Sequence, residues 1–145
     1  MPTYVVKFSN LKLSKSQKDD LAKGITDVHS KVTGANTFFA QVYFEKCESG
    51  DHYMGGKINN GSEIFLYGRI RSGRSNETKN ELLTKLRDII KKKLNLNTDN
   101  IWVYLIDLPP NQMIEYGQIL PNSGEEKEWF KNLPDELRKR LQSME

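Results

Sequence analysis

The sequence has little of what marks secreted, metal-binding or membrane proteins. Cys47 is the only cysteine among 145 residues, which excludes an internal disulfide and a cysteine-based metal site. No apolar run approaches the roughly 20 residues that cross a membrane, and the N-terminus lacks the charged head and apolar core of a signal peptide. We therefore expect a cytoplasmic protein without membrane association and without a metal.

An excess of charge of one sign is also absent. The net charge is only +3, and the two basic clusters, at residues 91–93 and 138–140, lie in helix-like sequence where a solvated surface explains them. We expect no nucleic-acid partner. The 145 residues, 37% of them hydrophobic and 28% charged, suit one globular domain with a real core.

The chain does contain a strand–helix–strand pattern. Residues Tyr4 to Phe8 are rich in β-branched and aromatic side chains, which predicts a strand. Ser14 begins a capping box with Gln17, and Gly34 provides the stop, so a helix is predicted between them. Residues 38–45 predict the second strand, and the Gly- and Asn-rich residues 46–62 predict turns without a regular element.

The same pattern then occurs again. Residues 63–71 and 101–108 predict strands and residues 75–94 a helix, and an offset of 61 residues carries Ser14 onto Ser75. Two β-α-β units of this length suit one four-stranded mixed sheet with both helices on one face, an α+β fold. We expect a single domain, residues 1–145, formed by units 1–45 and 63–108 and by a helix-prone packing arm, 109–145.

Pro2 has an unusual chemical option. If Met1 is removed, Pro2 becomes a secondary amine, and α-amino groups titrate near pH ~7.7 to 8.0. Such an amine can donate or accept a proton near neutrality. A proline here is equally compatible with simply opening a strand.

Five further polar or aromatic residues invite a functional interpretation, although each also has an ordinary structural one. His29 lies close to the apolar face of the first helix, and Arg71 and Arg74 end the third strand around Gly73, where two guanidiniums can bind a carboxylate or phosphate. Tyr104 lies in the last strand, and Glu115 follows it among apolar residues, where burial of a carboxylate is costly.

Together these positions resemble the cis-3-chloroacrylic acid dehalogenase group of the tautomerase superfamily, and the similarity covers nearly the whole chain. The matching segments are Pro2, His29, Ile70–Arg74, Trp102–Tyr104, Met113–Gly117, Gly124–Glu126 and Trp129–Pro134. The resemblance implies a tautomerase-type (MIF-like) fold, a homotrimer, an amino-terminal proline as the catalytic residue, and no metal or organic cofactor.

The resemblance also implies a reaction. Arg71, Arg74 and His29 hold the carboxylate of a short α,β-unsaturated acid and draw electron density from its double bond, which makes the β-carbon electrophilic. The product of adding water to a 3-haloacrylate collapses to malonate semialdehyde and halide.

The resemblance implies three further roles in that reaction. Tyr104 and Glu115 position and deprotonate the attacking water, and protonated Pro2 delivers a proton to the α-carbon.

Two alternatives stay open at this point. A keto-enol tautomerase or decarboxylase for a small oxo acid requires Pro2 and the arginines but not a water-activating Glu115 and Tyr104. A noncatalytic oligomeric binding protein on the same fold tolerates a retained Met1.

Overall fold

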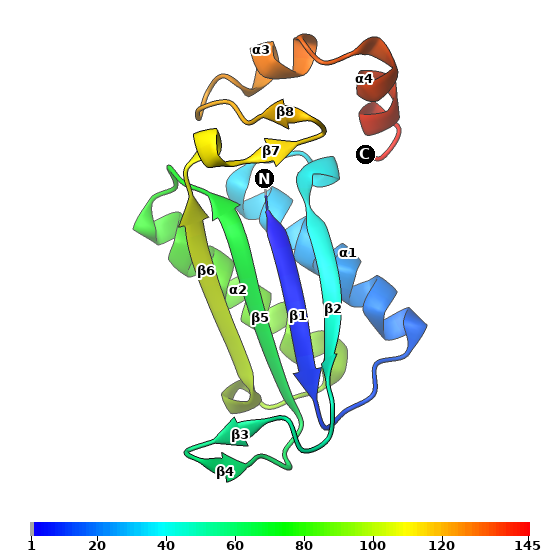
Figure 1. Cartoon of the computed structure of the whole chain (residues 1–145), viewed down its shortest axis with the longest axis vertical. Coiled ribbons are helices and arrows are strands. Elements are labelled where there is room, and N and C mark those ends of the chain that lie inside the picture. The colour runs from blue at the N-terminus through cyan, green and yellow to red at the C-terminus, as the bar shows by residue number, and fades with distance from the viewer. Residues whose placement is uncertain (1) are drawn as a thin grey trace.

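The computed structural model describes residues 2–145, and its centre is a four-stranded mixed sheet (Figure 1). The strand order is β2-β1-β5-β6, with β1 parallel to β2, β5 parallel to β6, and β1 antiparallel to β5. The strands are β1 (Thr3–Ser9), β2 (Gln41–Cys47), β5 (Glu63–Arg71) and β6 (Ile101–Leu108).

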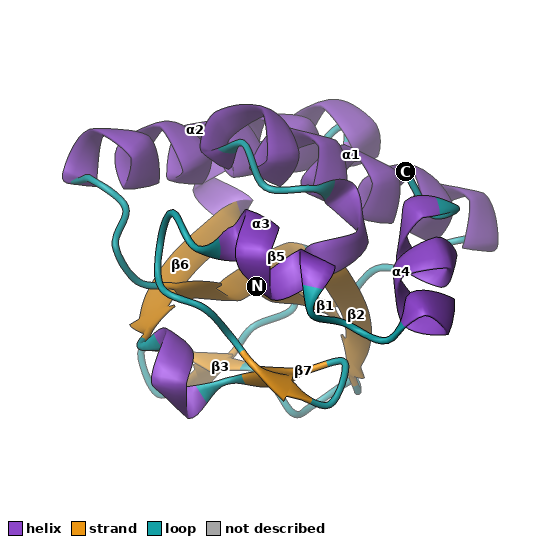
Figure 2. Ribbon diagram, turned by 90° about the horizontal axis from the view of Figure 1, so that it is seen from above, coloured by secondary structure: helices purple, strands orange, loops and turns teal. Residues whose placement is uncertain are grey.

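Two long helices, α1 (Lys15–Thr33) and α2 (Asn76–Leu94), cover one face of this sheet, and no α-helix of residues 2–145 covers the other (Figures 1 and 2). The predicted capping box of α1 is present: Ser14 Oγ accepts the Gln17 N–H, and Gly34 ends the helix with φ +72°. The predicted α+β fold, two β-α-β units forming one mixed sheet with both helices on one face, is confirmed.

The main core lies between the helices and the sheet. Alternate residues of the strands point inward, and the buried stripes of α1 and α2 meet them. The fully buried members are Tyr4, Val6, Leu21, Ile25, Ile64, Leu66, Ile70, Leu82, Leu86 and Ile90.

Two predictions about the connection between the units were wrong. Residues 38–45 are not one strand, because a 3₁₀ turn, η1 (Thr37–Phe39), buries both phenylalanines before β2 begins at Gln41. Residues 46–62 are not structureless, because β3 (Tyr53–Met54) and β4 (Lys57–Ile58) pair as a short antiparallel hairpin. Tertiary packing overrode the strand propensity of the aromatic pair.

The C-terminal part folds over one end of the sheet. The 3₁₀ turn η2 (Thr98–Asn100) precedes β6, and the 3₁₀ turn η3 (Pro110–Gln112) follows it. The C-terminal part then comprises β7 (Ile114–Glu115), β8 (Gln118–Ile119), α3 (Glu126–Lys131) and α4 (Asp135–Gln142). A second buried cluster holds it in place, made of Phe38, Phe39, Leu120, Leu133 and Leu141. No helix within residues 2–145 is long and apolar enough to span a membrane.

Candidate active site

The N-terminus, the β7–β8 hairpin and α3 gather at one end of the sheet (Figures 1 and 2). Thr3 pairs with Arg69 in the antiparallel ladder, so Pro2, one residue earlier, lies beside the end of β5 that leads into Arg71. Pro2 is buried, and its carbonyl accepts the Gln41 N–H at 3.0 Å. The predicted removal of Met1 concerns a residue outside those described.

A buried hydrogen bond joins β1 to α1 next to Pro2. The Tyr4 hydroxyl lies 2.7 Å from His29 Nδ1, and both side chains are almost fully buried. Gly68 on the neighbouring strand makes room for the Tyr4 ring, because a Cβ there would lie 2.4 Å from a ring carbon. Tyr4 was missed by the sequence analysis, since in sequence it is indistinguishable from an ordinary core residue of a strand.

Burial keeps the His29 imidazole neutral, and its hydrogen bond with Tyr4 favours one tautomer. Burial raises the pKa of the Tyr4 hydroxyl well above its ordinary value, despite the nearby charge of Arg74. Burial, with a smaller effect of the Arg74 charge, lowers the pKa of His29 to about 3. A neutral Tyr4 satisfies its O–H by donating to Nδ1, which leaves the proton of His29 on Nε2. That Nε2–H is buried and has no hydrogen-bond partner within residues 2–145, so it can donate to a ligand.

The depressed pKa of His29 makes the stability of the protein depend on pH. Because the folded pKa of about 3 lies below the ordinary value of 6.5, the unfolded chain binds a proton first as the pH falls. The contribution of His29 to stability is therefore complete above pH 6.5 and is lost progressively between pH 6.5 and 3. We expect His29→Gln to flatten this part of the stability curve, measured by chemical denaturation at pH 4.5 to 7.5. A curve as steep as that of the wild type would assign the loss to other groups.

Arg71 lies at the end of β5, and its guanidinium is bound by the C-terminal arm. Its NH1 group donates to the Pro121 carbonyl at 3.0 Å, and its NH2 group forms a short ion pair with Glu126. Only 6% of Arg71 is exposed, and its Nε has no partner within the described residues. Arg71 therefore attaches the start of α3 to the end of the sheet.

Arg74 lies on the other side of a sharp turn. Gly73, with φ +105°, provides the turn that the sequence predicted, and Arg74 NH1 donates to the Arg71 carbonyl at 2.5 Å. Burial, with repulsion from Arg71, lowers the pKa of Arg74. The charge of a bound anion would offset both effects and favour the charged form of Arg74.

Glu115 reaches this end of the sheet on the β7–β8 hairpin. Tyr116 (φ +54°) and Gly117 (φ +79°) form its turn, and the Tyr116 hydroxyl donates to the Phe38 carbonyl. That bond attaches the hairpin to η1, so half-buried Glu115 is carried on a fixed element rather than on a free loop.

The structure places Tyr104 away from Tyr4 and His29, on the opposite face of the sheet. Val103 and Leu105 of β6 pack into the core, so Tyr104 points to the face without helices, where it is 49% exposed. There it contacts Phe65, with ring centroids 5.0 Å apart.

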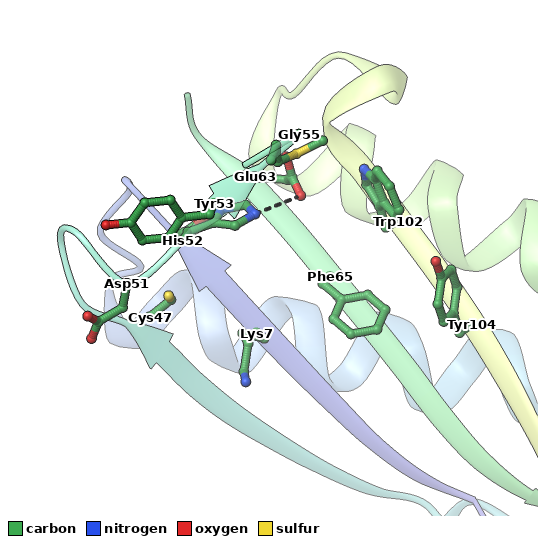
Figure 3. A pocket seen from close by; sticks show the side chains of 12 residues that line it. Lys7, Cys47, Asp51, His52, Tyr53, Gly55, Glu63, Phe65, Trp102 and Tyr104 are labelled. Atoms are coloured by element: carbon green, nitrogen blue, oxygen red, sulfur yellow. Dashed lines mark hydrogen bonds and ion pairs between the residues drawn. The ribbon is translucent and has the colours of Figure 1, made fainter. Parts of the chain in front are cut away.

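Tyr104 lines a separate cavity of about 560 Å³ near the β3–β4 hairpin. Figure 3 shows the side chains around this cavity. His52 is one of the residues that line this cavity. Its Nδ1 is 2.8 Å from Ser9 Oγ, and its Nε2 is 3.6 Å from the Glu63 carboxylate. Both ring nitrogens of His52 are thus used to attach the hairpin to β1 and β5. This cluster was not predicted from the sequence, because the hairpin that brings its residues together was not predicted. Residues 2–145 contain no group of three or more His, Cys, Asp or Glu side chains that could hold a metal ion.

The comparisons with known proteins concern the fold and the family of the chain. A member of the cis-3-chloroacrylic acid dehalogenase family, called N1, has 28% sequence identity and a TM-score of 0.93, covering 97% of this chain and 99% of its own. Native Ps01740 is 26% identical, with a TM-score of 0.73 over 78% of this chain and 99% of its own. A fused 4-OT symmetric trimer shares the fold, with 18% identity and a TM-score of 0.74 over 81% of this chain and 94% of its own. No curated protein sequence matches this chain.

A family model agrees with these structures. The model described as "putative oxalocrotonate tautomerase enzyme" matches residues 1–133, nearly the whole chain. The resemblance to the cis-3-chloroacrylic acid dehalogenase group is thereby confirmed. The chain belongs to the putative oxalocrotonate tautomerase family of the tautomerase superfamily.

Proposed function

We propose that this protein is a cofactor-independent hydratase or dehalogenase that adds water to a short α,β-unsaturated carboxylic acid. The observation that supports the proposal lies at the end of the sheet where β1 begins after Pro2: a buried neutral His29 and a partly buried Arg74 whose charge acts on it. A 3-haloacrylate is one substrate of this class.

The substrate carboxylate binds at the cationic side of the site. Arg74 supplies a charged donor, His29 supplies Nε2–H, and Arg71 adds its Nε–H. In the transition state, the carboxylate takes up electron density from the double bond, so donors already fixed around it stabilise that state more than the ground state. The β-carbon becomes electrophilic as a result.

Glu115 and Pro2 carry the two proton transfers. Glu115 removes a proton from water as the water attacks the β-carbon, and protonated Pro2 gives a proton to the α-carbon. This role of Pro2 requires a free amine, hence a chain from which Met1 has been removed. If the β-carbon bears a halogen, the halohydrin loses halide to give malonate semialdehyde.

Tyr104 has a role in this reaction only if it comes from another copy of the chain. Its place on the face without helices separates it from His29 within one chain. We propose a homotrimer, as in the fused 4-OT structure, in which Tyr104 of one copy helps to position the water in the site of the next. The single domain, residues 1–145, contributes the arm 109–145 to its own site through Glu115 and Glu126.

A second candidate function rests on the family model, whose description names an oxalocrotonate tautomerase. Moving a proton between oxygen and carbon of a small 2-oxo acid, or decarboxylating a 3-oxo acid, requires Pro2 and the anion site but no water base. Cis- and trans-unsaturated acids, acetylenic acids and 2-oxo acid enols, ranked by kcat/KM with the Met-free protein, decide between the two.

Arg74→Ala tests the anion site on which both candidates depend. Loss of a charge-assisted contact costs about 1.5 to 3 kcal/mol, so we expect kcat/KM for the acid to fall roughly 10- to 100-fold. The neutral amide of the same substrate should react poorly with the wild type and change little in the variant. Arg87→Ala, which removes an exposed guanidinium on α2, is the matched control. If wild-type protein turns over acid and amide equally, Arg74 does not bind a carboxylate.

A further inference from the structure

Glu126 already pairs with Arg71, one of the two arginines whose guanidinium would otherwise be expected to bind a substrate carboxylate. Its carboxylate pairs with Arg71 NH2, and its other oxygen accepts the Gly124 N–H at 2.9 Å. Partial burial tends to raise the pKa of Glu126, but hydrogen bonds from Arg71 and the backbone, with the charge of Arg71, outweigh it and lower the pKa. Glu126 is therefore an anion at neutral pH.

The pairing changes the charge that the site presents. Arg71 and Glu126 together are neutral, and Arg71 is nearly inaccessible to solvent. Arg74 differs, since its guanidinium donates to a backbone carbonyl, that of Arg71, rather than to a carboxylate. Arg71 has a carboxylate at contact distance, whereas Arg74 has none within residues 2–145. The positive charge that the pair of arginines offers to a ligand is therefore that of Arg74. His29 adds a donor but no charge, because it is neutral.

We propose that Glu126 is a specificity-determining residue that, by neutralising Arg71, restricts this site to substrates carrying one carboxylate. This inference rests on the proposed function, since it concerns the same anion site. A dicarboxylate would bring a second negative charge next to Glu126, with only the already paired Arg71 to receive it. That charge would meet repulsion at close range in a site partly shielded from water.

The test measures binding rather than turnover, with two saturated acids that cannot react. Dissociation constants for propionate and succinate are measured by titration calorimetry in the wild type, Glu126→Gln and Glu125→Gln. The wild type should prefer propionate. Glu126→Gln keeps the hydrogen-bonding shape but exposes the Arg71 charge, so succinate should gain about tenfold relative to propionate, as expected for one added unit of charge in a partly screened site. Glu125→Gln removes an exposed carboxylate one residue away and should leave the ratio unchanged.

A double variant separates charge from loosening of the arm. Arg71→Gln with Glu126→Gln removes both charges of the pair, so the ratio should return to that of the wild type. Fluorescence of Trp129 on α3, in a Trp102→Phe background, reports whether the arm stays packed. An unchanged ratio in Glu126→Gln, or an equal gain for succinate in the double variant, would overturn the proposal.

The result also separates this inference from the proposed reaction. If the acids bind with the expected selectivity but no unsaturated acid is turned over, the reaction is wrong and the role of Glu126 stands. If the wild type binds neither acid, there is no anion site, and both the proposed function and the role of Glu126 are wrong.

Discussion

Glu115→Gln is expected to lower water addition by roughly 10² to 10⁴-fold while leaving the ketonisation of a 2-oxo acid enol far less affected. Glutamine keeps the size and hydrogen bonding of the side chain but cannot accept the proton of the attacking water, and a general base contributes about that much. Ketonisation requires only a group that delivers a proton to carbon, which the proposed mechanism assigns to Pro2. Both reactions are followed as kcat/KM on the same preparations.

Two controls accompany this measurement. Glu125→Gln removes a carboxylate from the arm without touching the β7–β8 hairpin, and a thermal melt shows whether the hairpin variant stays folded. An equal loss of both activities in a folded Glu115→Gln protein would mean that Glu115 is not a dedicated water base. The tautomerase function would then be the better description of the site.

Pro2→Ala is expected to lower both hydration and ketonisation by at least ~10²-fold, the lower range for a general acid. Removal of Met1 leaves this alanine with a free α-amino group, so the variant keeps an amine at the same place. A primary amine has a different basicity and lacks the fixed ring geometry of proline, so some activity should remain. Steady-state kinetics on both substrates measure the loss.

The mass of the purified chain provides the control for this prediction. We expect Met1 to be absent, because an acylated Pro2 nitrogen has no proton to exchange near neutral pH. A protein that keeps Met1 quantitatively and still turns over substrate would contradict the amino-terminal mechanism. Retained Met1 with ligand binding but no turnover would favour a noncatalytic binding protein.

The elements of the fold could be predicted because local signals agree with the final structure. Ser14 and Ser75 both begin helices as the sequence indicated, and the apolar stripes that follow them form the core. Such signals act within a few residues along the chain, so they predict helices and strands without knowledge of the fold. The Phe38–Phe39 pair was misassigned because its burial depends on Leu120 and Leu133, far along the chain.

The sequence by itself determined the α+β repeat, the family resemblance and the identity of the candidate residues. Only the tertiary structure decided how the charges are shared among them. Tyr4 is hydrogen-bonded to His29 across 25 residues, Glu126 pairs with Arg71 across 55, and Tyr104 faces away from both. The reason is physical: a pKa, an ion pair or an exposed face depends on desolvation and on distances through space, and residue type and spacing along the chain encode neither.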